Sequence, residues 1–187
     1  VVCKPANATP LSAIALMVLA ERAGFPPGLM NIVTGKTTEI GAELTGNSLV
    51  RKVTFTGSTQ VGKQLMAECA ATVKRTSMEL GGNAPFIVFD DADVDAAVQG
   101  AIISKYRNAG QTCVCSNRIL VQTSVAEDFT TKFKAAVRSL EMGNGDKEGV
   151  AVGPLIDQNA AASVCDFIDD AVSCLLYTSP SPRDHQP

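Results

Sequence analysis

The sequence predicts an α/β fold in which helices cover parallel strands. Two observations predict it: short apolar segments alternate with helix-like segments along most of the chain, and the connections between them are short. Composition is the third observation, since the chain has 187 residues, of which 45% are hydrophobic and 19% are charged. That is enough apolar material for a sizeable core, which excludes a disordered or fibrous chain.

The first part of the chain alternates extended and helical segments. Its first helix is expected to take Thr9 as cap and Pro10 as first helical residue, and to stop before Gly24. The expected order is strand 1–4, helix 11–19, strand 29–33, helix 39–44, strand 52–56, helix 59–72 and an apolar strand that ends at Glu79.

The second part follows a double glycine at positions 81 and 82. Asp93 is expected to cap a helix, and Ser124 with Glu127 forms a capping box for another that reaches about residue 140. The remaining expected segments are strand 85–89, loop 108–117, extended segment 119–122, a glycine-rich stretch 143–154 and a last amphipathic helix around 164–172. We therefore expect part of one domain over residues 1–80 and part of a second over 81–173.

The periodic pattern ends after residue 173. Residues 175–187 hold three of the nine prolines and the only histidine, His185. We interpret 174–187 as a non-native tail, from a frame error or translated vector sequence, with a flexible linker as the alternative. Because the first residue is Val1 rather than methionine, the chain is expected to be an internal fragment of a longer protein.

Charge and rare residues exclude several functions. A formal net charge of −3 argues against nucleic-acid binding, and no apolar run approaches the roughly 18 residues of a membrane span. With one histidine, a Ser-His-Asp or Cys-His hydrolase cannot be assembled, so any base must be a carboxylate or a lysine. The six cysteines lack disulfide or zinc spacing, which favours a reducing compartment and no metal site.

A predicted strand runs into a predicted helix through Gly57 and Ser58. Such a turn aims free backbone N–H groups and the positive end of a helix dipole at one point, which suits a diphosphate. The segment is not a GxGxxG motif, and a plain strand-to-helix turn explains it equally well.

Two further residues are candidates for covalent chemistry. Cys113 lies in a polar loop, where a thiol becomes nucleophilic if a base, cation or dipole stabilises its thiolate. Glu79 ends an apolar strand, where a carboxylate is costly without a task or a partner. The alternatives are a small buried cysteine and a strand-end salt bridge.

Taken in order and spacing, these features resemble the aldehyde dehydrogenase superfamily over residues 1–173. The resemblance rests on four segments: Lys4-Pro-Ala, Phe55-Thr-Gly-Ser-Thr, Glu79-Leu-Gly-Gly-Asn83 and Gly110-Gln-Thr-Cys113. Within that superfamily the chain most resembles succinate-semialdehyde dehydrogenases, through Phe86-Ile-Val-Phe-Asp-Asp-Ala, the 107–117 segment and Gly153-Pro-Leu-Ile156. The resemblance implies a Rossmann-like cofactor domain and part of an α/β catalytic domain.

The resemblance also implies a mechanism. Cys113 attacks the aldehyde, its own backbone N–H stabilises the oxyanion, hydride leaves for a nicotinamide, and Glu79 activates the water that hydrolyses the thioester. An upstream asparagine of the oxyanion hole and a downstream glutamate for the nicotinamide ribose are missing. The fragment alone is therefore expected to be inactive.

Cofactor contacts carry over by the same resemblance. Lys4, Ala6 and Asn7 correspond to the adenosine ribose site, Gly57 and Ser58 to the diphosphate site, and Leu80 to a further cofactor contact. NAD-preferring relatives often carry glutamate at the position of Asn7, so a neutral residue beside Lys4 favours NADP or dual use over NAD alone. The alternative is that Asn7 only supports a turn.

Substrate choice is assigned to Arg107, whose guanidinium suits a distal carboxylate. The expected reaction is oxidation of succinate semialdehyde to succinate, as in 4-aminobutyrate breakdown. Three alternatives stay open: another ω-carboxy aldehyde such as glutarate semialdehyde, a non-catalytic relative used for binding or assembly, and a helix-end charge role for Arg107.

The resemblance carries three further expectations. Cys115 is expected to form a reversible disulfide with Cys113 on oxidation, because a nearby thiol can resolve a sulfenic acid. The full-length protein is expected to form a homodimer or homotetramer. It is expected in the cytoplasm or the mitochondrial matrix, with a small aldehyde as its only partner besides the cofactor.

Overall fold

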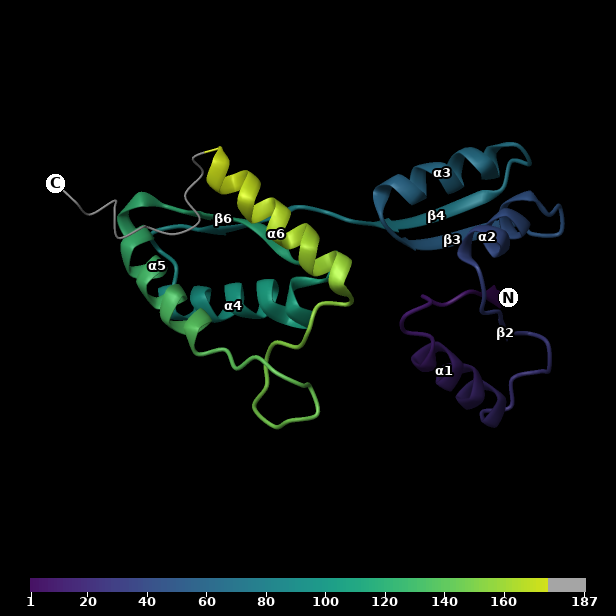
Figure 1. The fold of residues 1–187 in the computed structure, drawn as a ribbon, viewed down its shortest axis with the longest axis horizontal. Coiled ribbons are helices and arrows are strands. Elements are labelled where there is room, and N and C mark those ends of the chain that lie inside the picture. Colours follow the sequence, from purple (N-terminus) through teal and green to yellow (C-terminus); the bar gives the residue numbers. More distant parts are fainter. Residues whose placement is uncertain (175–187) are drawn as a thin grey trace. The chain divides into compact units, whose positions relative to one another are not determined.

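The computed structural model describes residues 1–174, which divide into two compact units, Val1–Gly81 and a second that begins at Gly82 (Figure 1). Helices and parallel strand pairs make up both, so the predicted α/β class is confirmed. Cys174 follows the last helix as its C-cap residue. The rest of the tail expected at 174–187 lies outside the described residues.

The first unit contains four strands and three helices: β1 (Val2–Cys3), α1 (Leu11–Arg22), β2 (Asn31–Ile32), α2 (Thr37–Gly46), β3 (Lys52–Gly57), α3 (Thr59–Ala70) and β4 (Arg75–Leu80). The strands pair as β1 with β2 and β3 with β4, both parallel, rather than as one continuous sheet. The first ladder is short because Pro5 has no N–H to extend β1, and the chain leaves β2 through Gly35 at φ +149°.

The cap expected for α1 is wrong. Pro10, not Thr9, is the N-cap residue, and no side chain caps the helix. The reason is local: the backbone N–H of Thr9 donates to the carbonyl of Ala6 at 3.3 Å, which places Thr9 in the preceding turn. Prolines are tolerated at helix starts because the first N–H groups have no partner inside the helix.

The second unit contains two strands and several helices: β5 (Ala84–Val88), α4 (Val94–Tyr106), a 3-10 helix, η1 (Arg107–Gly110), β6 (Ser116–Val121), α5 (Thr123–Arg138) and α6 (Gln158–Ser173). β5 and β6 are parallel, and α4 packs against α5 (Figure 1). Between them lies a core of Val88, Val98, Ala101 and Phe129, each at most 3% exposed. Burying a valine or phenylalanine side chain stabilises a fold by ~1.5–3 kcal/mol.

Helix starts in this unit confirm one expectation and correct another. Asp93 caps α4, since its carboxylate accepts the backbone N–H of Ala96 at 3.1 Å. The capping box of Ser124 and Glu127 is wrong, because α5 begins two residues earlier than that box requires, with Gln122 as N-cap. The side chain of Gln122 instead forms two hydrogen bonds with Asp90: its oxygen accepts the Asp90 backbone N–H, and its amide N–H donates to the Asp90 carboxylate. These bonds tie the helix start to the segment that follows β5.

A membrane crossing would need a longer and more apolar helix than any formed by residues 1–174.

Candidate active site

Cys113 lies in a tight turn, residues 112–115, which we call the thiol turn. The backbone N–H of Cys115 donates to the carbonyl of Thr112 at 3.4 Å, so Cys113 occupies the second position of the turn. Cys113 is exposed whereas Cys115 is 1% exposed, and both are free thiols. Among residues 1–174, the backbone N–H of Cys113 donates to no protein acceptor, which leaves it available to an oxyanion.

Polar contacts, some of them partly buried, support the thiol turn from α4. The hydroxyl of Ser104 lies 2.9 Å from that of Ser116, and accepts the backbone N–H of Ser116 at 3.2 Å. Next to them, Lys105 donates to the Asn117 side chain at 2.6 Å, and Asn117 donates to the Gly82 carbonyl at 3.3 Å. These bonds fix the start of β6 to the last turn of α4.

The segment before the thiol turn is left-handed over three residues: Asn108 has φ +53°, Ala109 +55° and Gly110 +76°. An L-residue such as Ala109 pays roughly 1–2 kcal/mol for this backbone. Reciprocal bonds offset the cost, since the side chains of Asn108 and Gln111 each donate to the other's carbonyl at 3.2 Å. Strain of this kind concentrates at functional sites.

Arg107 is the C-cap residue of α4 and is exposed. Within residues 1–174 its guanidinium forms no ion pair, while Lys132 on α5 pairs with Asp95 and Asp128. The hydrogen bonds that Lys132 donates to Asp95 and then to Asp128 raise the pKa of Lys132. Arg107 is therefore a cation whose charge no described carboxylate neutralises directly.

Glu79 stands near the end of β4, in register with Thr56 on β3. The desolvation cost expected from its apolar strand is not incurred, because the side chain is exposed. The alternative salt bridge has no partner among the described residues. Glu79 belongs to the first unit and Cys113 to the second.

The strand-to-helix turn forms at Gly57 and Ser58. Ser58 is the N-cap of α3, and its hydroxyl oxygen accepts the backbone N–H of Val61 at 3.4 Å, so its hydroxyl hydrogen is left to donate elsewhere. A side chain at Gly57 would collide with the ring of Phe55. Leu80 packs its side chain on Gly62 of α3, where an added Cβ would stand 2.6 Å from Leu80.

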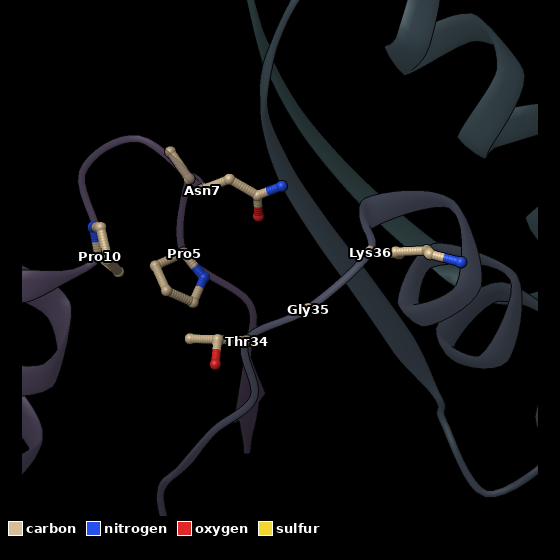
Figure 2. Close-up of a pocket in the computed structure, with 7 residues that line it drawn as sticks. Pro5, Asn7, Pro10, Thr34, Gly35 and Lys36 are labelled. Carbon is tan, nitrogen blue, oxygen red and sulfur yellow. The ribbon is translucent and has the colours of Figure 1, made fainter.

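Two of the sequence-predicted cofactor residues, Ala6 and Asn7, line one cavity of about 440 Å³, which we call the Asn7 pocket. Its other lining residues are Pro5, Pro10, Thr34, Gly35 and Lys36. Lys4 donates to the Asn7 side chain and to the Pro5 carbonyl, both at 2.8 Å. Figure 2 shows the Asn7 amide on one wall and Lys36 on the other, with the Lys36 ammonium turned away from Asn7.

Sequence reasoning missed the second wall of this pocket. A signal existed, because Thr34-Gly35 follows β2 just as Thr56-Gly57 ends β3. It also missed Ser104 and Ser116, whose roles depend on the pairing of α4 with β6. Among the described residues, no three His, Cys, Asp or Glu side chains gather in a way that could hold a metal ion.

Comparison with known proteins gives the same assignment over most of the chain. Residues 1–178 match the aldehyde dehydrogenase family. The chain is 63% identical to a glutarate-semialdehyde dehydrogenase of Pseudomonas putida over 172 residues, covering 92% of this chain and 36% of the relative. It is 58% identical to an NADP(+) succinate-semialdehyde dehydrogenase of Escherichia coli, covering 91% and 36%.

Solved structures agree with the sequence comparisons. A crystal structure of an aldehyde dehydrogenase from Brucella melitensis is 62% identical with a TM-score of 0.89, covering 92% of this chain and 36% of that one. Fold and comparisons together define the class, an α/β chain with the architecture of NAD(P)-dependent oxidoreductases. More narrowly, the chain belongs to the aldehyde dehydrogenase family, and it spans about a third of the length of the relatives it matches.

Proposed function

We propose that the full-length protein oxidises a short aldehyde bearing a distal carboxylate, with NAD or NADP as hydride acceptor. The observation that carries the proposal is Cys113, an exposed free thiol on a turn whose backbone N–H has no acceptor among residues 1–174. A thiol in this setting reaches a carbonyl carbon while the N–H meets the oxygen.

In the proposed reaction the Cys113 thiolate adds to the aldehyde carbon, and the resulting thiohemiacetal oxygen is held by the Cys113 N–H. A nicotinamide cofactor, when bound, would supply the oxidising power as hydride acceptor, and loss of hydride from that carbon would leave a thioester on Cys113. Glu79 then takes a proton from water, the water attacks the thioester, and the acid leaves as the thiolate is restored. An exposed carboxylate at a strand end can perform this step.

The residues of the first unit fit a dinucleotide. The first N–H groups of α3 and the free hydroxyl hydrogen of Ser58 suit diphosphate oxygens, and Gly57 has no side chain in their way. In the Asn7 pocket, a neutral amide held by Lys4 does not repel a 2′-phosphate. We propose that residues 1–80 are part of the cofactor domain, that Ala6 and Leu80 contribute contacts there, and that the cofactor is NADP or both dinucleotides.

Two ω-carboxy aldehydes are candidate substrates. Arg107 supports a distal carboxylate in either case, because its exposed guanidinium has no ion-pair partner among the described residues. The first candidate is succinate semialdehyde, oxidised to succinate in 4-aminobutyrate breakdown. Glutarate semialdehyde is the second, favoured by the 63% identity to a glutarate-semialdehyde dehydrogenase against 58% to the succinate enzyme.

We propose, in addition, a redox role for Cys115. Peroxide converts the Cys113 thiolate to a sulfenic acid, and the Cys115 thiol then displaces water from it to form a disulfide that dithiothreitol reduces. Wild type and Cys115→Ala would be oxidised and then reduced. Recovery of activity in the wild type alone supports the role, and equal recovery in both would end it.

Assembly and location complete the proposal. We infer a homodimer or homotetramer in the cytoplasm or mitochondrial matrix, where free cysteines are kept reduced. Light scattering on the full-length protein tests the assembly, and a monomer would contradict it. Fractionation of cells that produce the full-length protein tests the compartment, and recovery with membranes would contradict it.

The test of the proposed reaction uses the full-length enzyme and Glu79→Gln. Because Glu79 acts only on the thioester, the variant should release about one NAD(P)H per active site in a rapid burst and then turn over at least ~100-fold more slowly than wild type. Cys113→Ala should show no burst. A full burst in Cys113→Ala would contradict the proposal. If neither wild type nor any variant oxidises the aldehyde, the alternative of a non-catalytic protein used for binding or assembly is favoured.

A further inference from the structure

The thiol turn is closed twice, and the second closure is made by side chains. Its backbone bond, from the Cys115 N–H to the Thr112 carbonyl, is 3.4 Å, beyond the usual 2.7–3.2 Å range. The side chains of the same two residues are also in hydrogen-bond contact, through Thr112 Oγ1 and Cys115 Sγ. Because the backbone bond is long, this side-chain contact is a second link that helps to close the base of the turn.

Cys115 is also joined to helix α4. Its Sγ lies 3.7 Å from the carbonyl oxygen of Lys105, within reach of a thiol hydrogen bond. With the thiol donating to Lys105, the Thr112 hydroxyl donates to Sγ, so one chain of bonds runs from the turn to the helix. Cys115 is 1% exposed and its neighbour Ser116 is 7% exposed, so water has little access to the Cys115 thiol.

From this geometry we infer that Thr112 and Cys115 are positioning residues, which together hold the turn so that the Cys113 thiol and N–H face outward. The inference rests on the proposed function, in which Cys113 is the nucleophile. A residue at the second position of a turn changes direction when the first and fourth positions separate. Small displacements of a nucleophile are costly, because about 1 Å of misplacement can slow a reaction 100-fold.

The test uses the full-length enzyme in dithiothreitol, which keeps any disulfide chemistry silent. Thr112→Val and Cys115→Ala each remove one partner, while Thr112→Ser and Cys115→Ser retain a hydroxyl at the same place. We expect Thr112→Val and Cys115→Ala to lower the rate of the NAD(P)H burst about tenfold, as for one lost hydrogen bond at a reacting group. The burst rates of Thr112→Ser and Cys115→Ser should stay within about twofold of wild type. The Kd for NAD(P)H should not change in any variant.

Rescue by the hydroxyl variants separates positioning from packing. A burst rate within about twofold of wild type in Thr112→Val would overturn the inference, and so would a Cys115→Ser variant as slow as Cys115→Ala. Since Cys115 is buried, Cys115→Ala is susceptible to misfolding. If that variant misfolds, the burst rate of Thr112→Val alone tests the inference, because valine is nearly isosteric with threonine and position 112 is half-buried.

Failure of the inference is distinguishable from failure of the proposed function. If Cys113→Ala is inactive while Thr112→Val and Cys115→Ala behave as wild type, only the positioning role is lost. If Cys113→Ala retains the burst, Cys113 is not the nucleophile, and both the positioning role and the proposed function are contradicted. The rate of Cys113 alkylation by iodoacetamide gives a second readout, expected to fall in Thr112→Val and to recover in Thr112→Ser.

Discussion

The thiol turn of the second unit and the Asn7 pocket of the first are held by different kinds of interaction. The thiol turn stands on buried Cys115 and Ser116, which bond to α4, and α4 contributes to the unit's core. The Asn7 pocket is lined largely by exposed residues, and α1, which follows it, has no buried residue. The side-chain bonds of its residues, from Lys4 to Asn7 and from Lys36 to Glu39, are exposed.

Because of this difference, we expect the thiol turn to set the direction of the nucleophile and the Asn7 pocket to set which cofactor binds. A turn held by buried bonds keeps one direction, which a nucleophile needs. Exposed side chains around an open pocket are replaced without disturbing a core, so changes there alter which ligand binds rather than how well the fold forms. Changes near Cys113 are therefore expected to reduce kcat, and changes near Asn7 to alter cofactor choice.

Gly110→Ala is expected to have the largest effect. Gly110 has φ +76°, and an added Cβ would stand 3.2 Å from the Lys105 carbonyl, so the substitution strains the segment that leads to Cys113. We expect kcat to fall about 100-fold and the thermal midpoint to drop. The matched control is Gly145→Ala, at a glycine with open space around it, which should leave both unchanged.

Arg107→Ala is expected to raise the KM for succinate semialdehyde about 10- to 100-fold, as expected for loss of a charged hydrogen bond. The KM for an uncharged aldehyde of similar size should change far less. Arg138, in the last turn of α5, is a helix-end arginine with no assigned role, so Arg138→Ala serves as control. Equal effects on both aldehydes would leave Arg107 a helix-end charge.

Asn7→Glu is expected to lower kcat/KM for NADP⁺ about tenfold relative to NAD⁺. A glutamate beside Lys4 would take over the 2.8 Å contact and place negative charge where a 2′-phosphate would bind. Asn7→Gln keeps the amide and should retain the wild-type preference. An unchanged ratio in Asn7→Glu would show that Asn7 only supports its turn.

Thr45→Val tests the small electrostatic link between α2 and α3. Hydrogen bonds from Gln64 and then Thr45 lower the pKa of Glu68 from 4.5. Because the folded pKa is the lower one, this stabilisation is present above the unfolded value and is lost as pH falls through the folded value. The urea midpoint of Thr45→Val should be slightly below that of wild type at neutral pH. The part of this difference that comes from Glu68 should vanish in acid. Thr130→Val, at an exposed position, is the control.

Elements with regular spacing could be predicted from the sequence, and those set by tertiary pairing could not. The apolar face from Val94 to Ala101 and the Asp93 cap identify α4 locally. Ser116 and Asn117 suggest a loop because they are polar, yet they begin β6, where Ser104 and Gly82 satisfy them. Their partners lie 12 and 35 residues away, beyond any local pattern.

The candidate site divides in the same way. Cys113, Glu79 and Asn7 were identified from motifs, since residue type and spacing carry that information. The left-handed backbone at Ala109 could not be foreseen, because alanine has no preference for positive φ. The Lys36 wall of the Asn7 pocket depends on β1 pairing with β2, which brings residues 5–7 and 34–36 together.

The most direct test of the central claim is the identity of the acylated residue. Full-length Glu79→Gln would be mixed with succinate semialdehyde and NADP⁺, quenched within the burst, digested and analysed by mass spectrometry. The account predicts a succinyl thioester on Cys113 and none on Cys69, which is buried and whose thiol pKa is raised by desolvation. A burst of NADPH with Cys113 unmodified, or with the acyl group on another residue, would contradict it.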